Sequence, residues 1–188
     1  MKEEIIKTLK DLLSFKTYEE NKDEFEKLFN YIKKNYSNYS ITEYEFKDKK
    51  ALVLSNTDSH DLDIIMCTHI DIVHADTYDF TEDKDNIYGR GTIDMKASVA
   101  VCLTLLKNIK TDLSIALFIT SDEEIDGNCA NELSKIYNSK IAIVPDGGSN
   151  FDLISEEKGL IQLKLSTKTK PPHSAKLFEG VNAILKLM

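Results

Sequence analysis

The hydrophobic positions follow two different spacings along the chain. Residues 3–14 and 19–35 carry apolar side chains three or four positions apart, so each segment predicts an amphipathic helix. Residues 41–46 and 51–54 are shorter, and the polar stretch 47–50 separates them. This arrangement predicts a β-hairpin after the two helices.

The middle of the chain contains three short apolar runs, at 64–67, 115–119 and 141–144. Runs without alternation are typical of parallel strands that are covered on both faces. An almost wholly apolar helix is expected over 95–109, between the first two runs, and a weaker helix over 128–138, between the second and third. The order strand, helix, strand, helix, strand predicts an α/β layer fold with a mixed, largely parallel sheet.

The pattern changes again after Pro145. Residues 160–165 alternate like a half-exposed strand, and a short helix is expected from about Val181. One strand and one helix are too few to bury their own apolar faces. We therefore expect an α/β domain over 1–158 and the unfinished beginning of a second, α+β domain over 159–188.

Composition and charge narrow the classes of protein. The chain has 188 residues, of which 41% are hydrophobic, enough for a core and too many for wholesale disorder. Its net charge of −8 argues against nucleic acid or an anionic membrane as the main partner. No apolar run approaches the roughly 20 residues of a membrane span. The charged first residues do not resemble a secretory signal, and three widely spaced cysteines suit a reducing compartment, so we expect a cytoplasmic protein.

Polar side chains follow each of the three apolar runs. His69 and Asp71 come after the first, an acidic segment after the second, and Asp146 after the third. Ligands of open α/β sheets bind beyond the carboxyl ends of the strands, so these groups are expected at one edge. Asp94, just before the buried helix, adds another carboxylate. One imidazole with several carboxylates suits a divalent metal, most simply zinc.

Each of these residues also has a structural explanation. Asp94 suits the N-cap of the following helix, and Asp122, Glu123 and Glu124 suit the positive end of the next one. The Gly-Arg-Gly of 89–91 suits a nucleotide-binding loop but lacks its third glycine. The joint occurrence of ligand groups at three strand ends favours the metal site.

Four segments of the sequence resemble, in order, the motifs of a zinc hydrolase family. That family contains acetylornithine deacetylase, succinyl-diaminopimelate desuccinylase, aminoacylase, glutamate carboxypeptidase and several dipeptidases. The segments are THIDIV at 68–73, YGRGTIDMK at 88–96, SDEEIDG at 121–127 and PDGG at 145–148. EEKG at 156–159 and PHSA at 172–175 continue the resemblance into the lid domain of that family.

The resemblance implies a three-layer zinc-peptidase-like catalytic domain with a pair of metal ions. His69 and Asp146 would hold one zinc ion, Glu124 the other, and Asp94 would bridge both. Cobalt or manganese are possible substitutes for zinc.

The resemblance also implies roles for three further residues. Asp71 would orient the metal-binding imidazole by accepting its other N–H. Glu123 would be the general base, taking a proton from the attacking water and passing it to the leaving nitrogen. His173 matches a lid histidine that binds substrate and, in dimeric members, reaches the neighbouring subunit's site, which suggests a homodimer formed through the lid.

The sequence departs from the family pattern at several positions. His74 stands where the family usually has Pro, and Ala97 where Gly is usual. The family's last metal ligand is a late histidine, and no histidine follows His173 here. The second metal position would then have only Asp94 and Glu124. We therefore expect the amino-terminal half of such an enzyme, holding at most one zinc ion.

The function expected from these observations is metal-dependent hydrolysis of an amide bond in a small N-acyl amino acid or short peptide, of the deacylase or dipeptidase type. A chain of this extent is expected to be inactive by itself. The alternative is a catalytically dead fragment of the same fold that binds a metal or a partner.

Overall fold

The computed structural model of the chain describes residues 1–147, 152–156, 158–159, 161, 163–170 and 180–188. The chain divides into two units, Met1–Gly147 and Gly148–Met188. The first unit therefore ends before the expected boundary at residue 158. The assignment of the two parts as catalytic domain and lid stays a prediction.

A five-stranded sheet forms the middle of the first unit, with strand order β1-β2-β6-β3-β7. Strand β2 pairs antiparallel with both β1 and β6, whereas β3 pairs parallel with both β6 and β7. The sheet is therefore mixed, and the predicted hairpin and the three later strands are all present. Their bounds are β1 Ser40–Phe46, β2 Lys49–Ser55, β3 Asp61–His69, β6 Ile115–Thr120 and β7 Asn138–Ile143.

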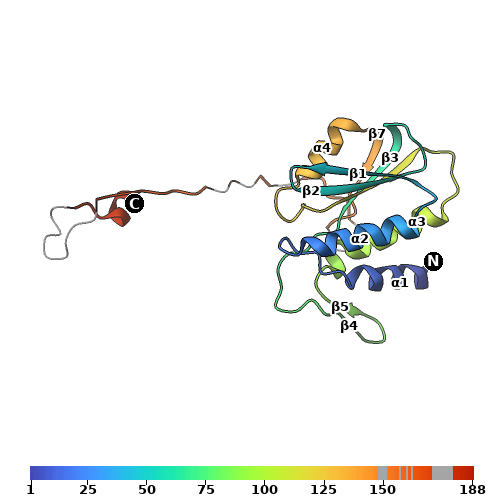
Figure 1. Cartoon of the computed structure of the whole chain (residues 1–188), viewed down its shortest axis with the longest axis horizontal. Helices are drawn as coiled ribbons and strands as arrows, with labels where there is room; N and C mark the ends of the chain where they lie inside the picture. Colours follow the sequence, from blue (N-terminus) through green and yellow to red (C-terminus); the bar gives the residue numbers. More distant parts are fainter. Residues whose placement is uncertain (148–151, 157, 160, 162, 171–179) are drawn as a thin grey trace. The chain divides into compact units, whose positions relative to one another are not determined.

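Helices cover both faces of this sheet, so the unit has three layers with the sheet in the middle (Figure 1). Successive residues of β2 point to opposite faces: Leu52 and Leu54 join one hydrophobic cluster, Ala51 and Val53 the other. The first cluster contains the buried residues of three helices, and the second those of one. These helices are α1 Lys2–Leu13, α2 Lys22–Asn35 and α3 Ala97–Asn108 on the first face, and α4 Asn128–Ile136 on the second. The α/β class and the layers agree with the sequence.

Strand β7 differs from the expectation of burial. All six of its residues are exposed, including Ile141 and Ile143. The prediction that this run is covered on both faces is wrong, because β7 is the last strand of the described sheet and neither hydrophobic cluster reaches its residues. The pattern of hydrophobic residues identifies an apolar strand, but it does not indicate whether the strand lies inside the sheet or at its edge.

The segment before α3 is irregular. A π-helical turn, η1 Thr92–Lys96, precedes the helix, so regular α-helix begins at Ala97, after the predicted start at residue 95. Asp94 has non-helical backbone angles, and its peptide bond to Met95 is cis. A two-stranded ladder of β4 Thr81–Glu82 and β5 Ile87–Tyr88 lies upstream and was not expected from the sequence.

The second unit contains little regular structure among its described residues. Residues 161 and 163–165 lie in no strand, so the strand predicted over 160–165 is not formed by them. The helix expected from Val181 is the short α5 Ala183–Leu187, capped by the side chain of Asn182, which accepts hydrogen bonds from two backbone N–H groups. No helix in the described part of the chain combines the length and hydrophobicity needed to cross a membrane.

Candidate metal centre

His69 is the last residue of β3 and lies at the end of the sheet where the parallel strands β3 and β6 finish. Its backbone pairs in register with Thr120 at the end of β6, and its side chain is buried. The imidazole Nε2 lies 3.1 Å from Oδ1 of Asp94 and 3.5 Å from Oδ2 of Asp146. The ends of β3 and β7 therefore bring His69 and Asp146 together, and the turn η1 adds Asp94 to them.

The two carboxylates arrive from different directions. Asp94 comes from η1, and its neighbour Met95 is fully buried with its sulfur accepting a hydrogen bond from the His69 N–H (3.2 Å). Asp146 follows β7, and the carbonyl of the preceding Pro145 accepts a hydrogen bond from Oγ of Ser98 on α3 (2.6 Å). Helix α3 thus contacts the segments that carry both acidic residues.

The donor set and its spacing fit a zinc ion. The ligand atoms of His69, Asp94 and Asp146 all lie within 4.8 Å of one another. Ligands placed about 2.0–2.2 Å from a tetrahedral zinc ion are about 3.4 Å from each other. The 3.1 and 3.5 Å separations from His69 Nε2 match that value. An imidazole nitrogen and carboxylate oxygens are also the ligands that zinc shares with cobalt and manganese.

The electrostatics of the site favour a cation. Burial raises the pKa values of Glu123 and Asp146, and the negative charges around each carboxylate raise them further. Burial alone would lower the pKa of His69, but the hydrogen bond and charge of Asp71, with the charges of Glu123 and Asp146, raise it to about 9. Crowded carboxylates around one imidazole repel each other, and a divalent ion among them removes that repulsion.

Asp71 connects His69 to the acidic segment after β6. The His69 Nδ1 hydrogen bonds to the backbone carbonyl of Asp71 (3.1 Å) and lies 3.3 Å from its carboxylate Oδ1. The other carboxylate oxygen accepts the backbone N–H of Glu124 (2.8 Å). A proton held on Nδ1 by these acceptors leaves Nε2 free to bind a metal.

The acidic residues after β6 occupy three different environments. Glu123 is half exposed, with Oε2 3.8 Å from His69 Nε2. Glu124 does not join the group of His69, Asp94 and Asp146. Asp122 is fully buried, and its carboxylate accepts the backbone N–H of Cys129 (2.9 Å) in α4. The helix-terminus explanation therefore holds for Asp122, while Asp94 makes no such cap and has non-helical backbone angles.

One predicted site residue and two supporting residues that the sequence analysis did not predict remain to be placed. His173 lies outside the described residues. The supports Met95 and Ser98 were missed because they read as ordinary members of an apolar helix. A sulfur and a hydroxyl within an otherwise aliphatic run are the only signals that the sequence offers for them.

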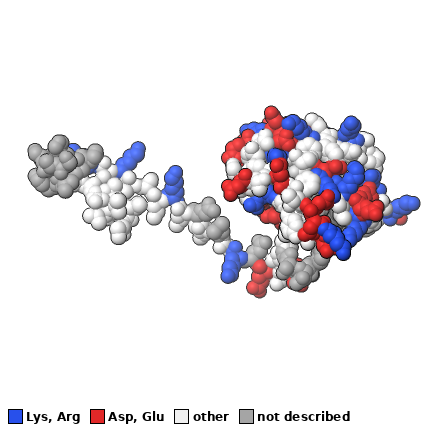
Figure 2. All heavy atoms as spheres, turned by 90° about the horizontal axis from the view of Figure 1, so that it is seen from below, with Lys and Arg blue, Asp and Glu red and all other residues white. Residues whose placement is uncertain are grey.

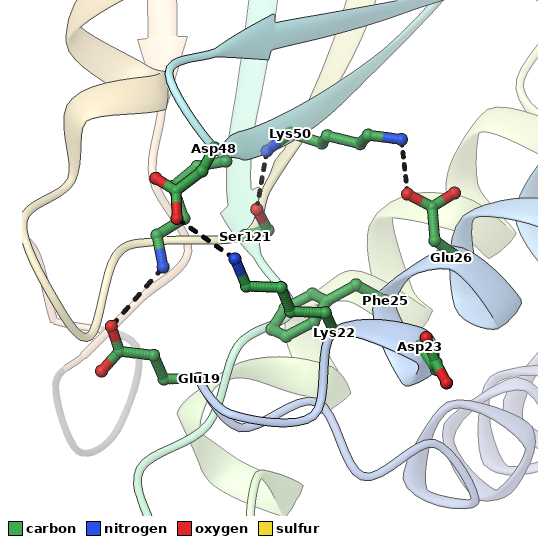
Figure 3. Close-up of a pocket in the computed structure, with 9 residues that line it drawn as sticks. Glu19, Lys22, Asp23, Phe25, Glu26, Asp48, Lys50 and Ser121 are labelled. Carbon is green, nitrogen blue, oxygen red and sulfur yellow. Dashed lines mark hydrogen bonds and ion pairs between the residues drawn. The ribbon is translucent and has the colours of Figure 1, made fainter.

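A pocket of about 190 Å³ lies between the start of α2, the β1–β2 turn and Ser121, and its lining includes none of His69, Asp94 and Asp146 (Figure 3). Its lysines face carboxylates, as in the pairs Lys22–Asp48 (3.4 Å) and Lys50–Glu26. The three lysines of its lining are all paired and Asp23 is the one carboxylate left over, so this pocket is a weaker candidate than the His69 cluster. The face in Figure 2 likewise shows basic and acidic side chains interspersed.

Comparison with known proteins identifies relatives at the level of sequence. Residues 65–168 match the model of peptidase family M20/M25/M40. The chain is 30% identical over 181 residues to a [LysW]-lysine/[LysW]-ornithine hydrolase of Saccharolobus solfataricus, covering 93% of this chain and 49% of that protein. It is also 30% identical over 144 residues to a probable carboxypeptidase of Paracoccidioides brasiliensis, covering 66% of this chain and 32% of that protein.

Comparison of structures supports the same fold. Human carnosine dipeptidase 1 superimposes with a TM-score of 0.62 at 15% identity, over 77% of this chain and 38% of the dipeptidase. The chain spans about half the length of the hydrolase relative that it matches.

Proposed function

The chain belongs to peptidase family M20/M25/M40, and from that membership we propose that it acts in the metal-dependent hydrolysis of an amide bond. The observation that carries the proposal is the convergence of His69, Asp94 and Asp146 at the sheet edge. The relatives include a hydrolase of [LysW]-lysine and [LysW]-ornithine and a probable carboxypeptidase. We therefore propose an N-acyl amino acid or a short peptide as the substrate.

The residues at the site divide the chemical work. His69, Asp94 and Asp146 would hold the metal, and a zinc ion bound there would act as a Lewis acid toward the amide carbonyl. Glu123 is the proposed general base, because its carboxylate lies 3.8 Å from His69 Nε2 and its pKa is raised, chiefly by burial. It would take a proton from the attacking water and deliver it to the leaving nitrogen. Asp71 would keep the His69 imidazole in its metal-binding form.

The finer parts of the proposal rest on the resemblance. Glu124 would hold a second metal with Asp94 as the bridge, and His173 would contact substrate. Residues 159–188 would belong to a lid through which the protein forms a homodimer. The cytoplasm is the proposed location, supported by the three cysteines, which are free thiols.

A matched pair of substitutions tests the proposal. Because the chain is expected to be inactive by itself, Glu123→Gln and Glu124→Gln are made in a longer protein that contains it, and that protein and its variants are titrated with zinc and assayed on N-acetyl amino acids and dipeptides. Glu123→Gln should keep its zinc at the His69 position and lose turnover by about 10²–10⁴-fold, the usual contribution of a general base. Glu124→Gln should lower zinc occupancy at the second position instead. Loss of metal in Glu123→Gln, or an unchanged rate, contradicts the proposed role.

A second candidate function is metal binding without turnover. Among the described residues, Glu124 does not belong to the ligand cluster, so the second metal position has too few ligands. This favours the second candidate. Tight zinc binding with no hydrolysis of any substrate in the panel would support this candidate. Failure of the chain to bind zinc at all would remove both.

A further inference from the structure

We propose that Lys96 is a positioning residue that holds Asp94 at the metal position by fastening its segment to the carboxyl end of α1. The proposal rests on the proposed metal site and adds the way in which the fold builds it. Lys96 lies two positions after Asp94, and its side chain is fully buried. It contacts neither the metal position nor any reacting group, so its action would be indirect.

The Asp94 carboxylate is not held in place by its own contacts. Its side chain is 60% exposed, and its one hydrogen bond within the described residues is with His69 Nε2 (3.1 Å). A metal bound between those two atoms would replace that hydrogen bond. The position of Asp94 must therefore be set by the backbone on either side of it.

Lys96 fixes the backbone on the carboxyl side. Its ammonium Nζ donates to the carbonyl of Phe15 (2.6 Å) and to that of Leu12 (3.2 Å). Leu12 lies in the last turn of α1, where a helix leaves carbonyl groups without partners inside the helix, and Phe15 lies two residues after the helix ends. A single side chain thus joins the metal-binding segment to a helix more than eighty residues earlier in the sequence.

Gly91 closes the same turn from the amino side. The backbone N–H of Lys96 donates to the Gly91 carbonyl (2.9 Å), and Gly91 adopts a left-handed φ of 82°. A Cβ at Gly91 would lie 2.7 Å from Cγ2 of Ile72 and 3.4 Å from Cδ of Lys96. The Lys96 stem therefore packs against a position where only glycine fits, and the loop that carries Asp94 is fixed at both ends.

The chain just after α1 also supports the second ligand-bearing segment. The Thr17 hydroxyl donates to the Ile70 carbonyl (2.5 Å), and the Ile72 N–H donates to the Thr17 carbonyl (3.0 Å). These bonds lie on both sides of Asp71, the residue that orients His69. Residues 12–17 contain no metal ligand, yet they are bonded to the segments that carry two of them. This shared support explains why a buried lysine is placed here, where an aliphatic side chain would pack without the cost of burying a polar group.

A general stabilising link between α1 and α3 is the competing explanation. A lysine within α3 provides a control, because Lys107 pairs with Glu4 of α1 (2.9 Å) at the other end of α3, away from Lys96 and η1. Lys107→Met removes one ion pair between α3 and α1, and Lys96→Met removes two hydrogen bonds from η1 to the end of α1 and the residues after it. Only Lys96→Met acts on the segment that carries Asp94.

The experiment measures zinc affinity of the 188-residue chain by competition with a chromophoric chelator. Lys96→Met should weaken zinc binding by about 10- to 100-fold, as loss of a group that orients a metal ligand does. Lys107→Met should change the zinc affinity by no more than about twofold, because it lies far from the metal position and acts independently of it. In an Asp94→Asn background, Lys96→Met should cause little further loss, because the residue on which it acts has already been removed. Lys96→Gln, which keeps amide donors for the α1 carbonyls, should restore part of the affinity.

The outcomes separate the inference from the function on which it rests. If the unchanged chain does not bind zinc, the proposed metal site fails and the inference fails with it. If the unchanged chain binds zinc and Lys96→Met binds equally well, only the inference fails. An equal loss in the presence and absence of Asp94 shows general destabilisation and also overturns it. Circular dichroism monitors folding, and if Lys96→Met does not fold, Lys96→Gln must show the dependence on Asp94.

Discussion

Replacement of Asp71 by asparagine tests how the site prepares its imidazole. Asp71 is 1% exposed, and its two carboxylate oxygens face different groups. One accepts the Glu124 N–H (2.8 Å), and the other lies 3.3 Å from His69 Nδ1. In Asp71→Asn, the amide oxygen can keep the bond to Glu124. The amide NH₂ then faces Nδ1 and disfavours the metal-binding tautomer, in which Nδ1 carries the proton, so that only the Asp71 backbone carbonyl (3.1 Å) still supports this tautomer.

The magnitude follows from the interaction that is lost. A hydrogen bond to a charged group contributes about 1.5–3 kcal/mol. Since 1.4 kcal/mol corresponds to a tenfold change in an equilibrium constant, zinc affinity should fall by about 10- to 150-fold. The His69 pKa, now raised to about 9, should also fall in the metal-free protein because the hydrogen bond and charge of Asp71 help to raise it.

Asp122→Asn is the matched control. Asp122 is also buried at the end of β6, and its carboxylate accepts one backbone N–H, from Cys129 (2.9 Å). It has no hydrogen bond to His69. Zinc competition titrations at neutral pH should show a large loss for Asp71→Asn and a change within about twofold for Asp122→Asn. Equal effects of the two substitutions, or normal zinc binding by Asp71→Asn, would refute the proposed role of Asp71.

Two further predictions concern stability. Asp63 has its pKa lowered to about 2, first by the hydrogen bond to Lys140 and then by those from Ser114. Since the folded pKa lies below the unfolded value, Asp63 should stabilise the wild type relative to Asp63→Asn at pH values above about 4. Denaturation at a series of pH values should show this advantage disappearing as the pH falls toward 2. Leu103→Ala, at a fully buried position of α3, should cost about 2–5 kcal/mol in urea denaturation, whereas Leu105→Ala, at a position 38% exposed on the same helix, should cost far less; equal losses would show that burial does not decide the effect.

Much of the candidate metal centre could be predicted because its arrangement depends on a simple property of the sheet. His69 and Asp146 follow strands that end at the same edge, so their positions in the sequence indicated their proximity. Asp94 required more, because it comes from an irregular turn that no periodicity describes. The order of the four motifs supplied that information, and the distances in the structure agree with it for the three residues.

Long-range supports could not be predicted in the same way. In the sequence, Lys96 is a polar residue at the start of an apolar helix. Nothing near it in sequence indicates that its side chain donates hydrogen bonds to the carbonyls of Leu12 and Phe15. Thr17 is equally ordinary in sequence, although it bonds to both sides of Asp71. The position of β7 at the sheet edge was also hidden, because strand order depends on all five strands together.

The exposed strand β7 has a consequence for how the protein behaves at high concentration. One side of its backbone pairs with β3, and the side chains of Ile141 and Ile143 are about half exposed. The exposed, uncharged apolar residues 141–143 of this edge strand are a template on which a strand of another molecule can be added. Lys140 is the one charged residue within β7, and its ammonium is already engaged by Asp63 (2.6 Å). Concentrated solutions of the unit Met1–Gly147 should therefore tend to aggregate through this strand. A second charge introduced at Ala142 would act as a gatekeeper against edge-to-edge pairing of strands.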